Sequence, residues 1–101
     1  MSYFRLRGKM KSTYTYKDVI KHFGGTTTKC YLTGQPIDIL KDNYNLDHIV
    51  PVSKGGTNDL ENMGIVIPDA NHSKSDLTLD EYLLLCKKVL ENFGYTVIKE
   101  A

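Results

Sequence analysis

Hydrophobic residues recur at helical spacing near both ends of the chain. A short helix is predicted between the cap residue Thr15 and the pair Gly24-Gly25, with apolar positions at Val19, Ile20 and Phe23. The clearest helix begins at Thr78-Leu79-Asp80-Glu81, which is the pattern of a capping box, and ends near Gly94. Its apolar face repeats every three or four residues and consists of Tyr82, Leu85, Cys86, Val89, Leu90 and Phe93. We expect this face, with Cys86 inside it, to be buried and to stabilise the domain.

Between these helices the pattern favours short strands separated by turns. Two extended pieces are expected within residues 29–39, around the turn Thr33-Gly34-Gln35-Pro36. A strand over 43–52, a Gly-rich loop over 53–59, a second β-rich run over 64–68, a short helix over 69–75 and a terminal strand over 95–98 complete the prediction. The order predicts a small α+β domain with a strand–loop–strand–helix unit at its centre.

Composition narrows the class of protein. The chain has 101 residues, of which 41% are hydrophobic, enough for one domain with its own core. Its longest unbroken apolar run, Leu83-Leu84-Leu85-Cys86, is far shorter than the roughly 18 residues of a membrane span, and no signal-peptide pattern is visible. Two cysteines, Cys30 and Cys86, are too few for a disulfide scaffold. We therefore expect a cytoplasmic domain with no membrane contact.

Charge is distributed unevenly although the formal net charge is only +1. Residues 1–17 contain five basic residues and no acidic residue, so the remainder of the chain is net acidic. A basic arm over 1–14, attached to a domain over 15–101, is typical of proteins that bind nucleic acid, although a solvated tail has the same composition. The candidate DNA-binding residues of the arm are Arg5, Arg7, Lys9 and Lys11.

The candidate chemistry lies in the predicted central strand, at Asp47-His48. Adjacent strand residues point to opposite faces, so both cannot face the core. Asp47 is suited to hold a hard divalent cation, and His48 presents an imidazole that titrates near neutrality and suits a general base. A surface acid beside a hydrogen-bonded histidine is the alternative for this pair taken alone.

Several further motifs occur around this pair in a fixed order. They are Cys30-Tyr31-Leu32-Thr33-Gly34, Asp47-His48-Ile49-Val50-Pro51, Ser53-Lys54-Gly55-Gly56-Thr57-Asn58, Leu60-Glu61-Asn62 and Asn71-His72-Ser73-Lys74. Together, over residues 30–76, they resemble the HNH endonuclease family, whose fold is called ββα-metal. The resemblance implies a ββα-metal core over about 44–76.

The resemblance also implies roles for individual residues. His48 matches the general base, Asp47 the metal-binding acid, and Asn62 the central asparagine that braces the loop and orients the histidine. In the family a lysine commonly lies three residues after the second metal ligand, and Lys74 then selects Asn71 over His72. Only one of these two can face the metal, because successive helix residues lie about 100° apart. Lys74, one helical turn beyond Asn71, would either neutralise a phosphate oxygen or be an ordinary solvated lysine.

With Asn71 as ligand, the chain is an H-N-N variant, similar to the HNH domains of RNA-guided CRISPR nucleases. One carboxylate and one amide oxygen favour Mg²⁺ or Mn²⁺. Many HNH domains bind a structural zinc through two Cys-x-x-Cys pairs, but here only Cys30 of the first pair remains, so we expect no structural zinc and a buried Cys30.

The expected reaction is hydrolysis of a phosphodiester bond in double-stranded DNA. The resemblance implies 5′-phosphate and 3′-hydroxyl ends, and one histidine with one metal would nick a single strand. Lys54 is a further candidate for contact with the DNA backbone, and targeting would come from a partner or a larger parent protein. The alternatives are a catalytically silent DNA-binding or assembly module, and a domain excised from a larger nuclease.

Overall fold

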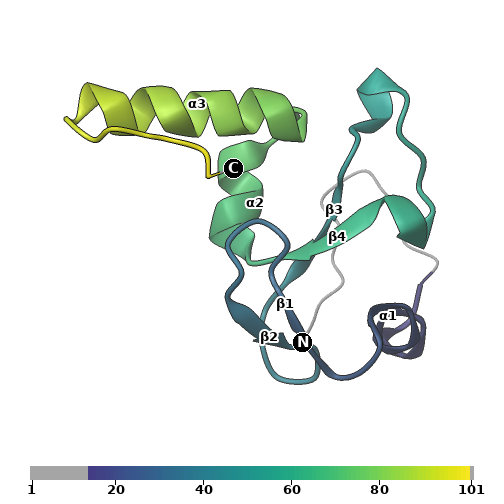
Figure 1. Ribbon diagram of the computed structural model, residues 1–101. Helices are drawn as coiled ribbons and strands as arrows, with labels where there is room; N and C mark the ends of the chain where they lie inside the picture. Colours follow the sequence, from purple (N-terminus) through teal and green to yellow (C-terminus); the bar gives the residue numbers. More distant parts are fainter. Residues whose placement is uncertain (1–13, 101) are drawn as a thin grey trace.

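The computed structural model describes residues 14–100 and has the α+β class that the sequence predicts. Its described part contains the helices α1 (Tyr16–Phe23), α2 (Pro68–Lys74) and α3 (Leu79–Asn92). The strands are β1 (Thr27–Lys29), β2 (Pro36–Asp38), β3 (Asn45–His48) and β4 (Met63–Val66), with 3-10 turns at Val52–Lys54 and Leu60–Asn62. The strands form two separate antiparallel pairs, β1 with β2 and β3 with β4 (Figure 1). The basic arm lies outside the described residues.

The helix boundaries follow the predicted capping residues. At α1, the Thr15 side chain accepts a hydrogen bond from the Asp18 N–H, the Asp18 carboxylate accepts from the Thr15 N–H, and Gly24 ends the helix at φ 83°. Thr78 and Glu81 form the same reciprocal pair at the start of α3. Each capping box satisfies backbone donors that the first helical turn leaves without a helical partner. Pro68 occupies the first turn of α2, one residue before the predicted start of this helix.

The pair β1–β2 is shifted along the chain from its predicted position. β1 ends at Lys29, and Pro36 begins β2 instead of closing the turn. The intervening residues form a loop in which the Gly34 N–H donates to the Cys30 carbonyl at 2.8 Å and the Cys30 N–H donates to the Gln35 carbonyl at 2.8 Å. These bonds hold a wider turn than the sequence predicted.

The strand predicted over 43–52 is shorter in the structure. β3 ends at His48, and its Cα partners on β4 include Gly64 opposite Asp47 and Met63 opposite His48. The chain then turns away from β4 because Pro51 has no N–H for the ladder and because Asn62 binds the backbone of Val50. Val50 is 43% exposed, so it lies outside the core, contrary to an apolar strand position.

The core gathers between α1, the two strand pairs and α2. Its buried hydrophobic residues are Val19, Cys30, Ile37, Ile39, Tyr44, Leu46, Met63, Ile65, Val66 and Ala70. All of them precede α3 in the chain. The prediction that Cys30 is buried is confirmed, since it is 1% exposed. The core therefore encloses β3 and β4 directly, and these are the strands that carry the candidate site.

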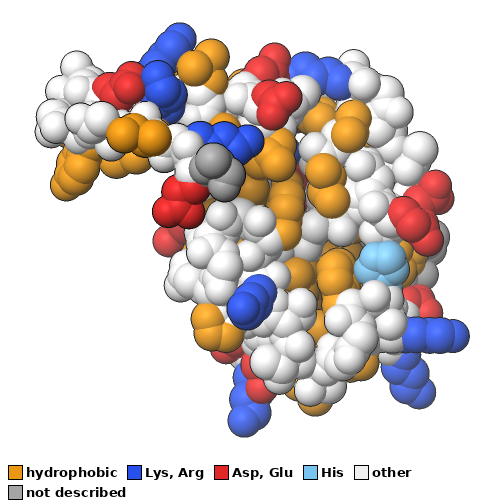
Figure 2. Space-filling view, viewed as in Figure 1, with side chains coloured by type: hydrophobic (Ala, Val, Ile, Leu, Met, Phe, Trp, Pro, Cys, Tyr) orange, Lys and Arg blue, Asp and Glu red, His pale blue; other side chains and the backbone are white. Residues whose placement is uncertain are grey.

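The prediction that α3 packs into the core is wrong for the described structure. No residue of α3 is buried, Cys86 is only partly buried, and Leu90 and Phe93 are 42% and 75% exposed. In Figure 1 the helix extends away from the strands beyond α2, and Figure 2 shows hydrophobic side chains on its surface. Residues 95–98 form no strand, although a terminal strand was expected there. The helical pattern was correct, but it does not determine what covers the apolar face.

Candidate active site

Strand β3 separates Asp47 and His48 onto opposite faces, as the alternation of strand side chains requires. Asp47 is buried, with 8% of its surface exposed, and the His48 ring is partly exposed. The carboxylate thus lies beneath the sheet surface while the imidazole can meet a ligand from solvent. This arrangement suits an acid that holds a cation and a histidine that handles a proton.

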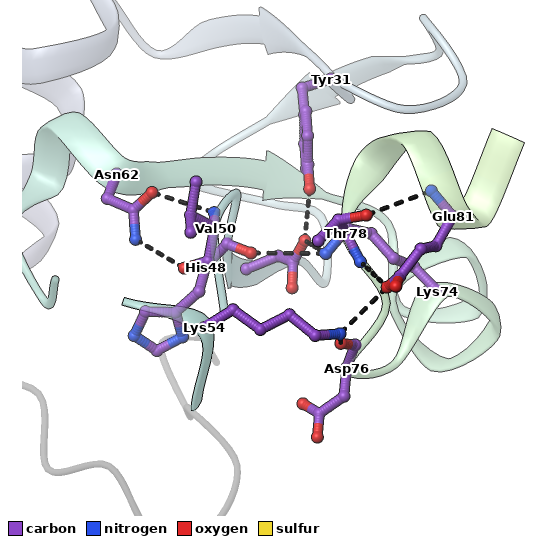
Figure 3. Close-up of polar contacts among 10 residues, drawn as sticks. Tyr31, His48, Val50, Lys54, Asn62, Lys74, Asp76, Thr78 and Glu81 are labelled. Carbon is purple, nitrogen blue, oxygen red and sulfur yellow. Dashed lines mark hydrogen bonds and ion pairs between the residues drawn. The ribbon is translucent and has the colours of Figure 1, made fainter. Parts of the chain in front are cut away.

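The Asp47 carboxylate is bound by two side chains from other elements. Its Oδ2 accepts a hydrogen bond from the Tyr31 hydroxyl and lies 3.1 Å from the Lys74 Nζ (Figure 3). Burial first, and then the hydrogen bond to Asp47, raise the pKa of Tyr31, so the phenol remains a donor. Within residues 14–100, Oδ1 of Asp47 receives no hydrogen bond. One oxygen is therefore held and the other is available.

Lys74 lies inside the site and not on the surface. It is fully buried, and its Nζ also donates to the His48 carbonyl at 3.4 Å. A buried ammonium needs such partners because removing it from water is costly. The prediction that Lys74 contacts a phosphate stays a prediction, and in this structure its charge is already paired with Asp47.

The His48 ring is held by a residue that the sequence did not single out. Its Nε2 lies 2.9 Å from the Oδ1 of Asn58, in the loop between β3 and β4. An amide oxygen only accepts hydrogen bonds, so this contact requires the tautomer with the proton on Nε2, in which Nδ1 keeps its lone pair. Asn58 belongs to the Gly-rich motif quoted above, but the motif alone gives no reason to connect it with His48.

Asn62 braces the loop that follows β3. Its side-chain oxygen accepts from the Val50 N–H at 3.0 Å, and its amide donates to the Val50 carbonyl at 3.0 Å (Figure 3). The amide also donates to the Thr57 carbonyl at 2.8 Å. The Asn62 backbone carbonyl accepts from the Ile49 N–H at 2.8 Å. A Cβ at Gly56 would lie 1.7 Å from the Val50 carbonyl oxygen, so the loop closes tightly here. These bonds fix the chain directly after His48 and directly before Asn58.

Helix α2 carries the two candidates for the second metal ligand. Asn71 is partly buried, and its side chain makes no hydrogen bond to any residue within 14–100, whereas His72 is exposed. Asn71 lies one helical turn before Lys74, whose ammonium contacts Asp47, so the two share the face of α2 that is turned toward β3. The exposure of His72 gives it no comparable relation to Asp47.

The donors present fit a hard divalent cation. Oδ1 of Asp47 and the Asn71 amide oxygen are hard ligands, and Mg²⁺ usually keeps several waters and takes its remaining ligands from a substrate phosphate. No cluster of three or more His, Cys, Asp and Glu side chains suited to a metal occurs among the described residues. A cation here would consequently depend on asparagine, water and substrate as well as on Asp47.

Two other predicted residues are placed in ways that bear on the site. Lys54 donates to Glu81 at 2.9 Å and to the Asp76 carbonyl at 3.0 Å, so it links the loop after β3 to the start of α3. The Cys30 thiol accepts from the N–H groups of Thr33 at 3.4 Å and Ile67 at 3.5 Å. Burial raises the pKa of Cys30, but hydrogen bonds from the Thr33 side chain and from the backbone of Ile67, Thr33 and Leu32 together lower it overall.

Two antiparallel strands and a short helix, with an acid, a histidine and two asparagines around them, form a strand–strand–helix site. The family model described as HNH endonuclease matches residues 30–78, and this part of the chain belongs to the HNH endonuclease family. Comparison with curated proteins and with solved structures gave no match. The family points to a nuclease acting on nucleic acid, and HNH domains generally use a divalent metal. Among the described helices, none is long and apolar enough to cross a membrane.

Proposed function

We propose that this protein is a metal-dependent HNH endonuclease that nicks DNA, with His48 as the general base. The observation that carries the proposal is the hydrogen bond between the His48 Nε2 and the Asn58 Oδ1, at 2.9 Å, on a ring that stays partly exposed. It leaves Nδ1 as the acceptor for a proton from water. General-base catalysis needs such an oriented lone pair within reach of the attacking water.

Asp47 and Asn71 are the proposed ligands of one Mg²⁺ or Mn²⁺ ion. When bound, the cation would stabilise negative charge on the phosphate and on the departing 3′ oxygen. Asp47 would contribute Oδ1, since its Oδ2 is already shared by Tyr31 and Lys74. Asn71 is supported by its unbonded amide within the described residues and by its place one turn before Lys74.

His48 and Asn62 together would deliver the nucleophile. His48 accepts a proton from water through Nδ1 as the water oxygen bonds to phosphorus. The bond between phosphorus and the 3′ oxygen breaks and the 3′ oxygen takes a proton from a solvent water, which gives 5′-phosphate and 3′-hydroxyl ends. Asn62 acts through the backbone, because its three side-chain bonds hold the loop that carries Asn58. A single histidine serves one strand, so the expected product is a nick.

The proposed affinity for double-stranded DNA depends on the basic arm. Arg5, Arg7, Lys9 and Lys11 would contact phosphates and release counterions, so binding should weaken steeply with salt. Neither Lys54 nor Lys74 adds to this electrostatic affinity for DNA in the present structure, since each is paired with a carboxylate. Targeting by a partner or a parent protein remains part of the proposal.

Nicking of supercoiled plasmid in Mg²⁺, Mn²⁺ or EDTA tests the function. His48→Ala should abolish metal-dependent relaxation, whereas His72→Ala, a histidine exposed on α2, should retain it. Asn71→Ala should lose activity as His48→Ala does. Loss of activity in Asn71→Ala but not in His72→Ala would identify Asn71 as the second metal ligand. If the folded protein binds DNA but relaxes no plasmid in any metal, the enzyme proposal is wrong and the chain acts as a binding module.

A further inference from the structure

We propose that Tyr31 is a positioning residue for the metal site, and that its hydroxyl orients the Asp47 carboxylate so that Oδ1 is presented to the cation. The inference rests on the proposed function. Tyr31 lies outside the strand–strand–helix unit, in the loop that follows β1, and reaches Asp47 from 16 residues away in the sequence. It does not contact the reacting atoms.

The ring reaches Asp47 by crossing the β3–β4 pair over a glycine. Gly64 is the Cα partner of Asp47 on the neighbouring strand. A Cβ built on Gly64 would lie 2.4 Å from Cδ1 and 2.5 Å from Cε1 of Tyr31, so the ring occupies the space that the missing side chain leaves. The Tyr31 N–H also donates to the Ile65 carbonyl at 2.9 Å, which fixes the backbone beside the same strand.

The hydroxyl matters because an aspartate carboxylate has no strong orientation of its own. The terminal torsion of Asp is broad, so the plane of the carboxylate is set by its hydrogen-bond partners. Here two donors converge on Oδ2: the Tyr31 hydroxyl from the loop after β1, and the Lys74 ammonium, at 3.1 Å, from α2. Two donors from different elements fix the plane, whereas one donor would permit rotation. Partners that orient ligating groups typically change metal affinity 10- to 100-fold when removed.

Tyr31→Phe isolates this effect because it keeps the ring on Gly64 and removes only the hydroxyl. The matched control is Tyr82→Phe, which removes a tyrosine hydroxyl that bonds Ser73 at 3.1 Å in the contact between α3 and α2. Binding of Mn²⁺ is measured without DNA, by calorimetry, at a temperature where each variant is fully folded. Plasmid nicking is then measured over a range of Mn²⁺ concentrations. Asp47→Ala defines the binding that belongs to the site.

The proposal expects Tyr31→Phe to weaken Mn²⁺ binding by about 10- to 100-fold, with Tyr82→Phe unchanged. The Mn²⁺ concentration for half-maximal nicking should rise by a similar factor, while the rate at saturating Mn²⁺ changes little. If Tyr31 only supported the fold, Tyr31→Phe would lower the unfolding midpoint and would not raise the Mn²⁺ requirement at an unchanged saturated rate. Unchanged Mn²⁺ affinity in Tyr31→Phe, with binding lost in Asp47→Ala, overturns the role of Tyr31 and leaves the proposed function intact. Unchanged binding and nicking in Asp47→Ala overturn both.

Discussion

Replacing Lys74 with methionine would test how strongly the buried ion pair supports this domain. Lys74 is fully buried, and its Nζ lies 3.1 Å from Oδ2 of Asp47, whose side chain is 9% exposed. Methionine keeps the apolar stem and removes the charge, so the Asp47 carboxylate stays buried with Tyr31 as its remaining described donor. Breaking a buried pair from one side costs about 3–5 kcal/mol. That is a large fraction of the roughly 5–15 kcal/mol by which domains are stable.

The measurement is thermal and urea unfolding of Lys74→Met beside Lys54→Met. In a domain of this size each kcal/mol moves the midpoint by roughly 4–8 °C, so Lys74→Met should lower it by at least about 12 °C. Lys54 pairs with Glu81 at 2.9 Å, but the two side chains are 40% and 50% exposed. Such an exposed pair contributes little to stability, because solvent screens both charges. Similar N–O distances thus predict very different losses, and burial is the variable that differs.

A double variant, Asp47→Asn with Lys74→Met, completes the test. It leaves no unpaired charge in the site, so it should be more stable than Lys74→Met alone, and the cycle should give a coupling above about 1 kcal/mol. Equal losses in Lys74→Met and Lys54→Met would refute the reasoning, because they would mean that solvent screens the Asp47 carboxylate as fully as it screens Glu81.

Three further outcomes follow from the backbone, the strand contact and the first turn of α3. Ser75 adopts φ 53° and ψ −132° at the end of α2, a conformation that is costly for a residue with a Cβ. Ser75→Gly should therefore raise the free energy of unfolding by about 1 kcal/mol in urea titrations. Ser75→Ala, which keeps the Cβ, should not. Gly64→Ala would place a methyl group 2.4 Å from the Tyr31 ring, so it should destabilise the domain and weaken Mn²⁺ binding as Tyr31→Phe does; tight Mn²⁺ binding in a folded Gly64→Ala would contradict the contact. The Thr78 N–H chiefly lowers the pKa of Glu81, so its contribution to stability is present above the unfolded pKa and is lost as pH falls through the folded pKa. Glu81→Gln should therefore flatten the acid side of the stability profile, and an unchanged slope would count against the capping box.

Local features of the fold could be predicted from the sequence because their causes are local. The predicted cap at Thr15 and the predicted capping box of Thr78 with Glu81 each involve residues three apart in the chain. The order of β3, loop, β4 and α2 followed from short β-rich runs, such as Ile65-Val66-Ile67, and from the Gly-rich loop between them. Each of these signals lies within a few residues of the structure that it specifies.

The partners of the site residues could not be predicted in the same way. Tyr31 meets Asp47 across 16 residues, Lys74 meets the His48 carbonyl across 26, and Asn58 meets the His48 ring across 10. A tyrosine in a turn and a lysine on a helix have the same sequence signal whether they face solvent or a buried carboxylate. Only the packing of the loop after β1 against β4, and of α2 against β3, decides between these outcomes.

The apolar face of α3 is a second case in which the sequence pattern does not determine the partner of the residues. Periodicity predicts that one side of a helix avoids water, and it correctly predicted a helix from Leu79 to Asn92. It does not say which surface covers that side. Here the core is already closed by residues from Val19 to Ala70, so Leu90 and Phe93 remain exposed.

The division of roles between Asp47 and His48 depends on the register of β3 against β4. A shift of one residue would exchange the two faces of the strand, which would bury the imidazole and expose the carboxylate. Two contacts oppose that shift. Gly64 lies opposite Asp47 and admits the Tyr31 ring at this position, where a side chain would exclude it. At the end of the strand, the Asn62 carbonyl accepts from the residue after His48 at 2.8 Å, while its side chain holds the loop beyond. The proposed chemistry therefore depends on a glycine and an asparagine that set which residue faces the solvent, because the order Asp-His gives two functions only when the strand presents them in this register.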